Sequence, residues 1–575
     1  MDVIALIIIS FFGYIIAYNT YGKFLARKIF KISHAEDVPS KVCEDGIDFV
    51  PTKKAIIFGH HYTSIAGTGP IVGPAIGIIW GWVPAMIWIF FGSIVIGAVH
   101  DFGALIISMR NQGKSVSEIA AQYISPNIRY IFFLIVFFEL LIVISVFGVI
   151  IAIIFSLFPT SVLPVWLQIP IAVMLGKAVY KKGANVTYAT VISVCFMYIS
   201  MVAGSYVPFT IPDILWIPAT GLWTIILLVY VFFASTLPVT NLLQPRDYIN
   251  AWQLFIVMGF LFIGACVSGF TTEICIVAPS FRLKPPGAPP IWPFLCMTIV
   301  CGAISGFHSL VSSGTSSKQI ARPQDALFVG YGAMLLEAAL ATLVIVAVAA
   351  GIGLKYSTNE GNILTGVTAW DAHYASWISS FGLGSKIKAV VIGSSNMMRS
   401  IGIPERIGIV IMGVFIASFA GTTLDSATRI QRYVISELFT NTKLNFLTNR
   451  FTATAVAVIS AAILAFTTGV DGKGALELWP VFGGVNQILA ALTLIVLTLY
   501  LKKKGGFIYL FTAIPCIFMI IMTVWGIFLN EMTFLKDENW LLVFINGLIF
   551  SLSLCLIGES FGVFFGFNNG KISKT

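Results

Sequence analysis

The stretch GHHYTSIAGTGPIVGP, residues 59–74, interrupts an apolar run that covers residues 54–80. Glycine and proline at this density leave backbone amides and carbonyls without helical partners. In a bilayer such groups are tolerated only where they line a protein cavity or a water-filled path. The stretch therefore predicts a membrane helix that is broken near its middle, and the two histidines beside the break favour a functional role. The alternative is a kinked helix whose small residues let a neighbouring helix pack closely.

The composition requires a lipid environment. Of 575 residues, 58% are hydrophobic and 10% are charged, whereas a soluble domain has roughly 25% charged residues. Runs of about 20 apolar residues, the length that crosses a hydrocarbon core, recur along the chain. The short alternating strands of an outer-membrane barrel are absent from the sequence. We therefore predict an all-α polytopic membrane protein.

Two further features argue against other classes of protein. The eight cysteines form no CxxC pair, which argues against a zinc site or a disulfide framework. The net charge of +9 comes from basic residues in short loops between apolar runs, which indicates topology rather than a nucleic-acid-binding patch. We expect no metal, no cofactor and no nucleic acid. The expected partners are the lipid bilayer and a small-molecule substrate, and the sequence does not predict the oligomeric state.

We expect about 15 membrane spans, within a range of about 14–18. The predicted spans are 2–21, 54–80, 84–108, 129–158, 165–180, 184–207, 221–243, 250–272, 292–315, 326–354, 405–428, 451–468, 475–501, 507–529 and 540–565. The loops on one side of this scheme carry 25 of the 34 Lys and Arg residues. Because cytoplasmic loops are enriched in positive charge, we expect the N-terminus outside the cell and the C-terminus in the cytoplasm.

We treat residues 1–575 as one integral membrane transport domain. Residues 1–53 would hold the first helix and a cytoplasmic loop, 54–435 the transport core and 436–575 accessory helices. Segment 355–404 falls on the outer side, and its apolar run is too short to span the membrane. We predict an ordered external loop there, with a lid or a re-entrant piece as alternatives.

Two other segments depart from the pattern of an uninterrupted membrane helix. The first, FFASTLPVTNLLQPRDY (232–248), contains Pro238, which cannot donate a helical hydrogen bond. It lies five predicted spans after the first break, the separation expected for equivalent helices of two inverted five-helix repeats. The second, CGAISGFHSLVSSGTSSKQ (301–319), is rich in hydroxyl groups. Hydroxyl and carbonyl oxygens suit hard cations, although serines also satisfy local backbone groups.

These three segments supply the predicted pathway for substrate and coupling ion. Its residues are His60, His61, Ala66, Gly67, Thr68, Gly69, Ser235, Thr236, Asn241, His308, Ser312, Ser313 and Thr315.

Ionisable residues inside a membrane are costly and suggest function. Glu139 and Glu337 fall near the middle of their spans, and the neighbours His100 and Asp101 fall in the inner half. A histidine beside a carboxylate can change protonation near neutral pH, and a carboxyl buried in apolar surroundings can also carry a proton. We therefore predict these four residues as candidates for proton coupling. Neutral, hydrogen-bonded structural groups are the alternative. We place a further set at the cytoplasmic margin as ion pairs: Arg246, Asp247, Asp425, Arg429 and Arg432.

The same segments resemble the carbon-starvation protein A (CstA) family. The resemblance covers residues 59–74, GAVHDFGAL (97–105), 232–248, 301–319, FAGTTLDSATRIQRY (419–433) and LWPVFGGVNQILA (478–490). It implies a bacterial cytoplasmic-membrane importer that acts in carbon starvation. Members of the family are described as peptide transporters, and some as proton-coupled pyruvate transporters. The resemblance also implies a relation to the amino acid–polyamine–organocation (APC) superfamily, and hence a LeuT-like inverted-repeat core with discontinuous helices.

In that superfamily the first broken helix and the eighth core helix together hold a cation. If the second predicted span is core helix one, the ninth is core helix eight. Ser312, Ser313 or Thr315 would then lie against the carbonyls freed around Ala66 and Gly67. We predict that a proton serves this role, with Na⁺ as the alternative.

The resulting hypothesis is a secondary active, proton-coupled importer of peptides, pyruvate or both. The alternatives are a Na⁺-coupled symporter and a membrane nutrient sensor without transport. An intramembrane hydrolase built on Ser312 or Ser313 with His308 has no supporting motif in the sequence, so we do not expect an enzyme.

Overall fold

The structure is a computed structural model that describes residues 2–126, 128–271, 274–358, 360–377, 382–440 and 443–566. These residues are mostly helical, with one two-stranded antiparallel hairpin. The helices and strands are α1 (Asp2–Ala17), α2 (Pro39–Val42), α3 (Lys54–Ile65), α4 (Gly69–Gly77), α5 (Trp82–Gly92), α6 (Ala98–Arg110), α7 (Val116–Tyr123), α8 (Ile128–Leu157), α9 (Val162–Gly176), α10 (Val186–Gly204), α11 (Ala219–Thr236), α12 (Leu243–Phe270), α13 (Ile291–Thr298), α14 (Gly306–Gly314), α15 (Ala333–Ala349), β1 (Tyr356–Ser357), β2 (Ile363–Leu364), α16 (Gly366–Tyr374), α18 (Leu383–Arg399), α19 (Glu405–Phe439), α20 (Arg450–Ala465), α21 (Trp479–Lys503), α22 (Leu510–Lys536) and α23 (Trp540–Phe565).

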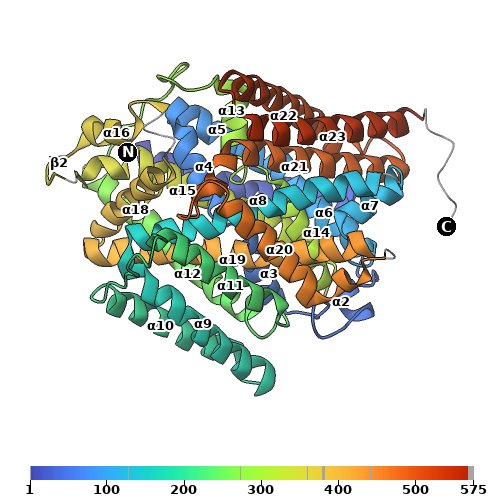
Figure 1. Cartoon of the computed structure of the whole chain (residues 1–575), viewed down its shortest axis with the longest axis horizontal. Helices are drawn as coiled ribbons and strands as arrows, with labels where there is room; N and C mark the ends of the chain where they lie inside the picture. Colours follow the sequence, from blue (N-terminus) through green and yellow to red (C-terminus); the bar gives the residue numbers. More distant parts are fainter. Residues whose placement is uncertain are drawn as a thin grey trace.

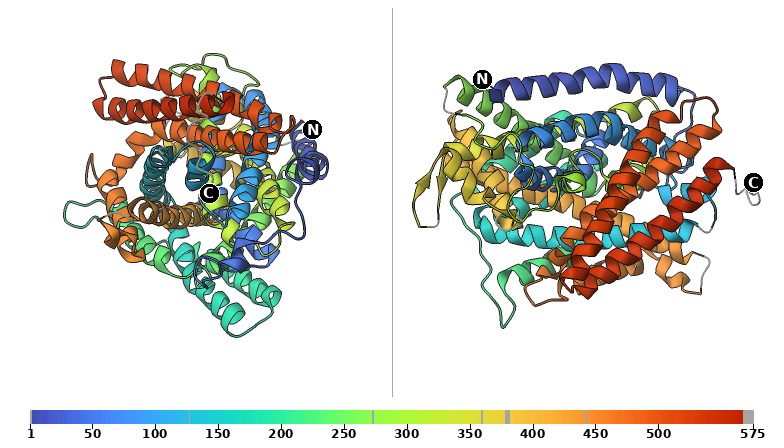
Figure 2. Two further views of the ribbon diagram at one scale, coloured as in Figure 1. Left: turned by 90° about the vertical axis from the view of Figure 1, so that its right-hand side faces the viewer. Right: turned by 90° about the horizontal axis from the view of Figure 1, so that it is seen from above.

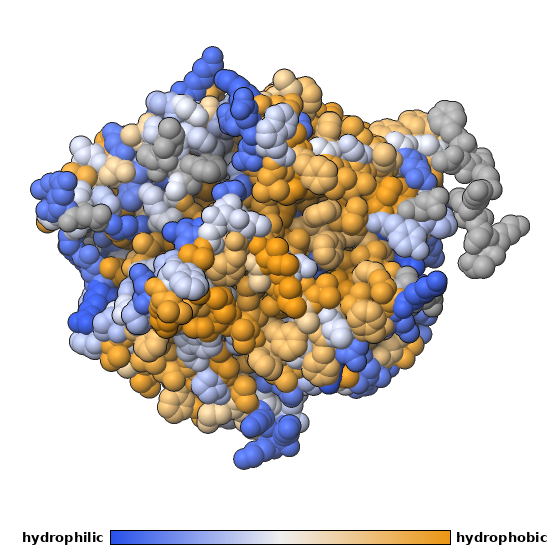
Figure 3. Space-filling view, viewed as in Figure 1, coloured by the Kyte–Doolittle hydropathy of each residue, from blue (hydrophilic) through white to orange (hydrophobic). Residues whose placement is uncertain are grey.

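The helices form a membrane bundle. Among the described residues, 12 helices are long and apolar enough to cross a bilayer, and the pair Lys54–Ile65 and Gly69–Trp80, bent by 41°, brings the number to 13. In Figure 1 the long helices run largely along the horizontal direction. Figure 3 shows apolar residues over most of the middle of this face, with hydrophilic residues gathered mainly toward its two ends. The chain is thus a polytopic helical membrane protein.

The predicted count of about 15 spans is not confirmed. The predicted span 292–315 consists of the short helices α13 and α14, separated by residues 299–305. The predicted span 451–468 is α20, which has 16 residues. The other predicted spans correspond to the long helices and the bent pair. The first of these differences is informative, because it makes residues 291–314 a second discontinuous helix.

The break expected at Pro238 is a connection between two complete helices. The α11 helix ends at Thr236, and Leu237 is extended with ψ 153°, as expected for a residue that precedes proline. The α12 helix begins at Leu243. Pro245 lies in its first turn, where its missing N–H costs no helical hydrogen bond. The predicted pairing of this segment with the first break is therefore wrong.

Segment 355–404 is more than an ordered loop. It contains the β1–β2 hairpin, α16 and α18. The α18 helix packs against α19, α15 and α4, and Tyr374 at the end of α16 donates a 2.6 Å hydrogen bond to the carbonyl of Ala75 in α4. Trp370 stacks on the Tyr374 ring with 4.1 Å between centroids. This segment is fixed to the second half of the first broken helix.

The bundle is organised around α8 and α19, which pack along each other. The α9 and α10 helices form a hairpin at the lower edge of Figure 1, and α22 and α23 lie at the upper edge. In the right-hand view of Figure 2, α1 runs along one side of the molecule. The first residues of α1 and the last of α23 lie at opposite ends.

Loops that the sequence places on the basic side contact each other. Arg110 forms an ion pair of 2.7 Å with Glu36 and donates to the Tyr500 hydroxyl over 2.9 Å. Ser115 donates to Glu437 over 3.0 Å. These contacts are consistent with the predicted alternation of loops between two sides.

Candidate functional site

The first broken helix lies against α19. Between α3 and α4 the backbone leaves helical geometry at Ala66, and a Cβ on Gly67 would collide with the Thr423 hydroxyl. Thr423 donates to the carbonyl of Ser64 over 3.3 Å, and the Ser64 and Ser426 hydroxyls are 3.0 Å apart. The close approach of α19 thus requires glycine at position 67. Hydroxyl groups of α19 satisfy part of the polar backbone at the break.

The second break crosses the first. A Cβ on Gly69 would collide with the Cys301 side chain, and one on Gly73 would lie 2.6 Å from the carbonyl of Thr298. The α4 helix therefore packs directly on the last residue of α13 and on the residues that follow it. Two interrupted helices thus meet inside the bundle.

The start of α14 is capped by a side chain from α21. Asn486 accepts hydrogen bonds from the backbone N–H of Phe307 over 2.9 Å and from the Ser305 hydroxyl over 3.1 Å. A buried amide oxygen therefore replaces a helical partner that the break removes. The sequence places α21 among the accessory helices, yet this helix supports the second discontinuous helix directly.

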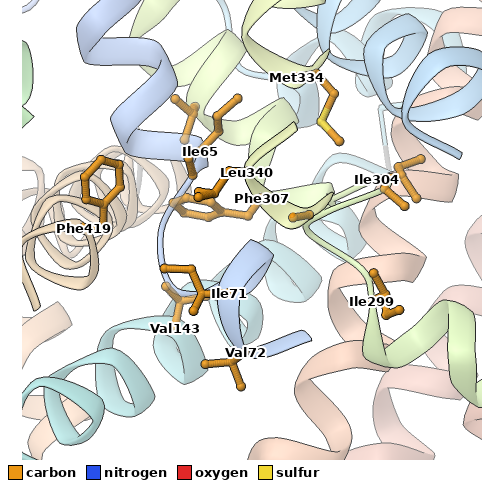
Figure 4. Close-up of a cluster of buried hydrophobic side chains, with 14 of the residues drawn as sticks. Ile65, Ile71, Val72, Val143, Ile299, Ile304, Phe307, Met334, Leu340 and Phe419 are labelled. Atoms are coloured by element: carbon orange, nitrogen blue, oxygen red, sulfur yellow. The ribbon is translucent and has the colours of Figure 1, made fainter. Parts of the chain in front are cut away.

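An apolar cluster surrounds this crossing. Figure 4 shows Ile71 and Val72 of α4 near Val143 of α8, together with the Phe307 ring and Leu340. All of these side chains are buried. The cluster holds the two halves of the crossing together.

Four buried ionisable residues form a chain of contacts across α6, α14 and α15. Asp101 lies between two histidines, with His100 Nδ1 2.7 Å from its Oδ1 and His308 Nδ1 2.9 Å from its Oδ2. The other ring nitrogen of His308 lies 3.4 Å from Glu337 Oε2. All four side chains are fully buried. We call His100, Asp101, His308 and Glu337 the relay cluster, since adjacent titratable groups of this kind can hold and pass a proton.

A second buried network lies between α3, α12 and α19. His60 Nδ1 is 2.6 Å from Asp247 Oδ2, and Arg246 lies 2.6 Å from Asp425 and 3.9 Å from Asp247. Arg246 also donates to the Tyr230 hydroxyl over 2.6 Å. Arg246 is 4% exposed and both carboxylates are fully buried. These residues therefore form ion pairs, as expected, and the pairs are buried between α12 and α19.

Arg429 and Arg432 have a different partner. Both bind Asp48 in the loop before α3, at 2.8 and 3.4 Å. Burial raises the pKa of Asp48, but the two guanidinium groups outweigh this effect and hold the pKa below its ordinary value. Arg429 also donates to the carbonyl of Leu237. These contacts tie the loop before α3 to α19 and to the α11–α12 connection.

The hydroxyl groups of α14 form no hydrogen bond to the first break among the described residues. The Ser313 and Thr315 hydroxyls donate to carbonyls one turn earlier in their own helix, over 2.7 and 3.0 Å. The Ser312 hydroxyl is buried without a hydrogen bond in the described part of the chain. The hydroxyl that lies on Gly67 belongs to Thr423 instead, because α19 is the helix that runs beside the break.

The remaining predicted residues are dispersed. His61 Nδ1 is 2.7 Å from the Ser316 hydroxyl, just beyond the end of α14. The His61 ring also lies close enough to Asp101 and His308 of the relay cluster for their charges to act on it. Thr236 bonds within its own helix. Asn241 is exposed in the α11–α12 connection.

Two further predicted residues are buried in α8 and α11. The Ser235 hydroxyl lies 3.5 Å from the carbonyl of Asp425 in α19. Glu139 is fully buried, and neither of its carboxyl oxygens has a hydrogen bond among the described residues. Glu139 therefore stands apart from the relay cluster, although the sequence groups it with the proton-coupling candidates.

Thr423, Ser426, Asn486 and Tyr230 are site residues that the sequence does not single out. Thr423 and Ser426 lie within the stretch 419–433, and Asn486 lies within 478–490. A polar amide in an otherwise apolar span is the signal that could have found Asn486. Short hydroxyl residues give no such signal, because they are common in membrane helices.

A cavity of about 950 Å³ opens beside the crossing. Gly69, Gly73 and Cys301 line it, so it reaches both interrupted helices. The rest of its wall comes from α13, α21, α22, Trp377 and residues 287–290. We call this cavity the vestibule.

Comparisons of sequence and fold relate this chain to known membrane proteins. The sequence model of the family described as “Carbon starvation protein CstA” matches residues 2–526. A “Peptide transporter CstA” from Campylobacter jejuni is 32% identical over 92% of this chain and 80% of its own length. One from Bacillus subtilis is 32% identical over 91% of this chain and 90% of its own. The “Pyruvate/proton symporter BtsT” of Escherichia coli is 30% identical over 91% and 81%.

A solved manganese transporter from Eremococcus coleocola has a similar fold, with a TM-score of 0.50 and 12% identity. The alignment covers 91% of this chain and 99% of that one. This likeness concerns the fold alone. The family match and the apolar helices make this chain a multi-pass protein of the cell membrane.

Proposed function

Because this chain belongs to the carbon starvation protein CstA family, we propose that it imports small organic solutes across the bacterial cytoplasmic membrane together with protons. The solutes are peptides, pyruvate or both, taken up in carbon starvation. The names of its relatives support a transporter rather than an enzyme, since they include peptide transporters and a pyruvate/proton symporter. In this proposal the N-terminus lies outside and the C-terminus in the cytoplasm, as the distribution of Lys and Arg predicts.

Proton coupling is the part of the proposal that the relay cluster supports. Asp101 joins two histidines within 2.9 Å, and Glu337 lies beside the second histidine. A net charge on these buried groups is costly in free energy. The cluster is therefore expected to take up or release a proton when water reaches it. Alternating access of the two broken helices would supply that water. In this proposal the second network, around Arg246, does not exchange protons and only holds α3 and α19 in place.

The substrate site of the proposal lies at the start of α4. The Thr68 hydroxyl is buried without a hydrogen bond among the described residues, and Thr68 occupies the N-cap of α4. A helix N-terminus with a free hydroxyl favours an anionic group. A carboxylate is the chemistry that peptides and pyruvate share. Half-helix ends serve this role in other transporters.

The two breaks also favour an inverted-repeat core of five plus five helices. We propose that α3–α4, α5–α6, α8, α11 and α12 form the first repeat. The second repeat contains α13–α14, α15, α19, α20 and α21. The hairpin α9–α10 is then an addition at the edge of the bundle, where Figure 1 draws it. This scheme makes α19 core helix eight, which agrees with the contact between Thr423 and Gly67.

A Na⁺ ion is the second candidate for coupling, and one observation favours it. Thr423 and Ser426 bring two hydroxyl oxygens to Ser64 at the first break. Oxygen ligands of this kind suit a hard cation. The relay cluster favours protons more strongly, because its four titratable side chains contact one another.

Uptake by the purified protein in liposomes tests the proposed function. We expect labelled dipeptide or pyruvate to accumulate inside when the outer solution is more acidic than the lumen, without Na⁺. Accumulation that requires a Na⁺ gradient and ignores the pH gradient would replace the proton by Na⁺. Absence of uptake under either gradient would favour a nutrient sensor.

A further inference from the structure

The vestibule is larger and more apolar than transport of a small polar acid requires. Its volume of about 950 Å³ lies in the range of pockets that enclose drug-sized ligands. Its wall contains Phe294, Met297, Trp479 and Phe482. A three-carbon keto acid would leave most of this surface without a partner.

Three parts of the wall come from outside the ten helices of the proposed core: α22, Trp377 and residues 287–290. The α22 helix contributes Asn530 and Thr533, and Trp377 follows α16. Trp377 is held in place, because its ring lies 5.4 Å from that of Trp80 and its backbone N–H donates to the carbonyl of Pro286 over 2.8 Å. Asn530 also donates to a backbone carbonyl of α21 over 3.1 Å. The wall is therefore anchored by specific contacts and is not left open by loose packing.

Among the described residues that line the vestibule, one charged side chain of each sign lies at its rim. Lys536 and Asp537 are neighbours at the end of α22, and both are exposed. An ammonium and a carboxylate side by side suit a zwitterion, which carries both charges and no net charge. Steering of a simple anion would need an excess of positive charge at the rim.

The floor of the vestibule adjoins the candidate substrate site at Thr68. Gly69 follows Thr68 at the start of α4, and Cys301 packs on Gly69. A solute whose carboxylate lies at the start of α4 can therefore extend its other groups into the vestibule without leaving the site.

We propose that the vestibule is a specificity subsite that binds the apolar side chains of zwitterionic short peptides, with α22 as its selective wall. This inference rests on the proposed function and deepens it. Peptides with large apolar side chains gain contact with the aromatic wall, whereas dialanine and pyruvate reach only the floor. The competing occupant of an apolar cavity in a membrane protein is a lipid acyl chain.

Filling the vestibule from α22 tests this inference. The variant Thr533→Trp adds a large ring to the wall, and Leu535→Trp is its matched control, since Leu535 is exposed on the same helix outside the vestibule. In liposomes that hold the full-length chain, we expect Thr533→Trp to lower kcat/KM for leucyl-leucine about ten-fold, the scale of a changed apolar pocket. Uptake of dialanine and of pyruvate should change less than about two-fold, within the effect of a surface substitution. Leu535→Trp should transport all three solutes like the unmodified chain.

An equal loss of kcat/KM for all three solutes would contradict the proposed subsite, because the vestibule would then not distinguish between solutes. Unchanged leucyl-leucine uptake, or an acyl chain that copurifies and that leucyl-leucine fails to displace, would overturn it as well.

A measurement of peptide binding can test the subsite even if the proposed transport function fails. If the unmodified chain shows no gradient-driven uptake, the proposed function fails. Thermal stabilisation of the purified chain by leucyl-leucine, lost in Thr533→Trp and kept in Leu535→Trp, would still support the subsite. Absence of this stabilisation in the unmodified chain would reject it.

Discussion

At the scale of single residues, the site holds two networks of buried ionisable groups, one without and one with an arginine. In the described part of the chain, the relay cluster of His100, Asp101, His308 and Glu337 forms no ion pair with a Lys or Arg. Arg246, in contrast, holds Asp425 in a charged network. Arginine stays protonated under physiological conditions. Under the proposed function, the relay cluster is therefore a buried network whose charge changes during transport.

The variant Asp101→Asn should uncouple transport from the proton gradient. An amide keeps the size of the carboxylate but removes the charge that lies between the two histidines. We expect accumulation driven by a pH gradient to fall about a hundred-fold, the scale of losing a positioned proton carrier. Exchange of labelled for unlabelled solute without a gradient should fall much less. The exposed Asp371→Asn serves as the control, and full gradient-driven accumulation in Asp101→Asn would contradict the role of the cluster.

Asp48 should make the stability of the protein depend on pH. Its pKa lies below the ordinary value because Arg429 and Arg432 outweigh its burial. A lowered folded pKa contributes stability above the ordinary pKa of about 4, and this contribution is lost as the pH falls through the folded pKa.

The variant Asp48→Asn should destabilise the protein by about 3 kcal/mol at neutral pH, because it leaves Arg429 buried without its carboxylate partner. Thermal unfolding in detergent measures this change. The difference from the unmodified chain should shrink as the pH falls toward and below the pKa of Asp48. Glu44→Gln in the same loop is the control, since Glu44 is exposed. An equal difference at neutral and strongly acidic pH would show that charge is not the cause.

At the scale of the elements, the two discontinuous helices position the candidate site. Their crossing depends on glycine, because a Cβ on Gly67 or Gly69 would enter the side chain of Thr423 or Cys301. The variant Gly67→Ala should therefore displace α19 at a cost of about 1–3 kcal/mol, typical of an overpacked core. We expect it to reduce uptake strongly, as measured in liposomes. Gly421→Ala on α19 is the matched control, because its Cβ would meet no atom within 4 Å. Equal uptake by both variants would argue against a close contact at the break.

The sequence predicts the first discontinuous helix and misses the form of the second. Residues 59–74 combine glycine, proline and histidine in one apolar run, which is a strong local signal. Pro238 gives a false signal, because a proline marks an ordinary connection as readily as a broken helix. Residues 299–305 give only a weak signal in the sequence. They are not helical where α4 packs against Thr298 and Cys301. Such a contact joins residues far apart in the chain, and no local pattern encodes it.

The candidate site shows the same division. Asp101 and His308 stand out in the sequence because charged residues are rare in membrane spans, but their contact of 2.9 Å cannot be read from it. Thr423 escapes notice because a threonine is common in a membrane helix, and its role depends on the glycine that lies against it. The sequence shows that Arg246 is charged, but it does not show that the side chain is buried, because this burial depends on the packing of α12 against α19.

At the scale of the whole molecule, the two ends of the bundle should face different compartments. Cys43 lies in the loop before α3, and Cys275 follows α12 on the opposite predicted side. In variants that keep one of these cysteines, a membrane-impermeant thiol reagent added to intact cells should label Cys275 and spare Cys43. Permeabilised cells provide the control, in which both should react. Labelling of Cys43 alone in intact cells would invert the orientation that the distribution of Lys and Arg predicts.

If solute and proton cross the membrane together, addition of solute should by itself move protons, and this movement is the most direct test. Liposomes that contain the purified chain and a pH-sensitive dye are prepared without any initial pH or Na⁺ gradient. Addition of leucyl-leucine or pyruvate outside should acidify the lumen, and Asp101→Asn should abolish this acidification while labelled solute still exchanges. Entry of labelled solute into liposomes of the unmodified chain without any acidification of the lumen would contradict the account.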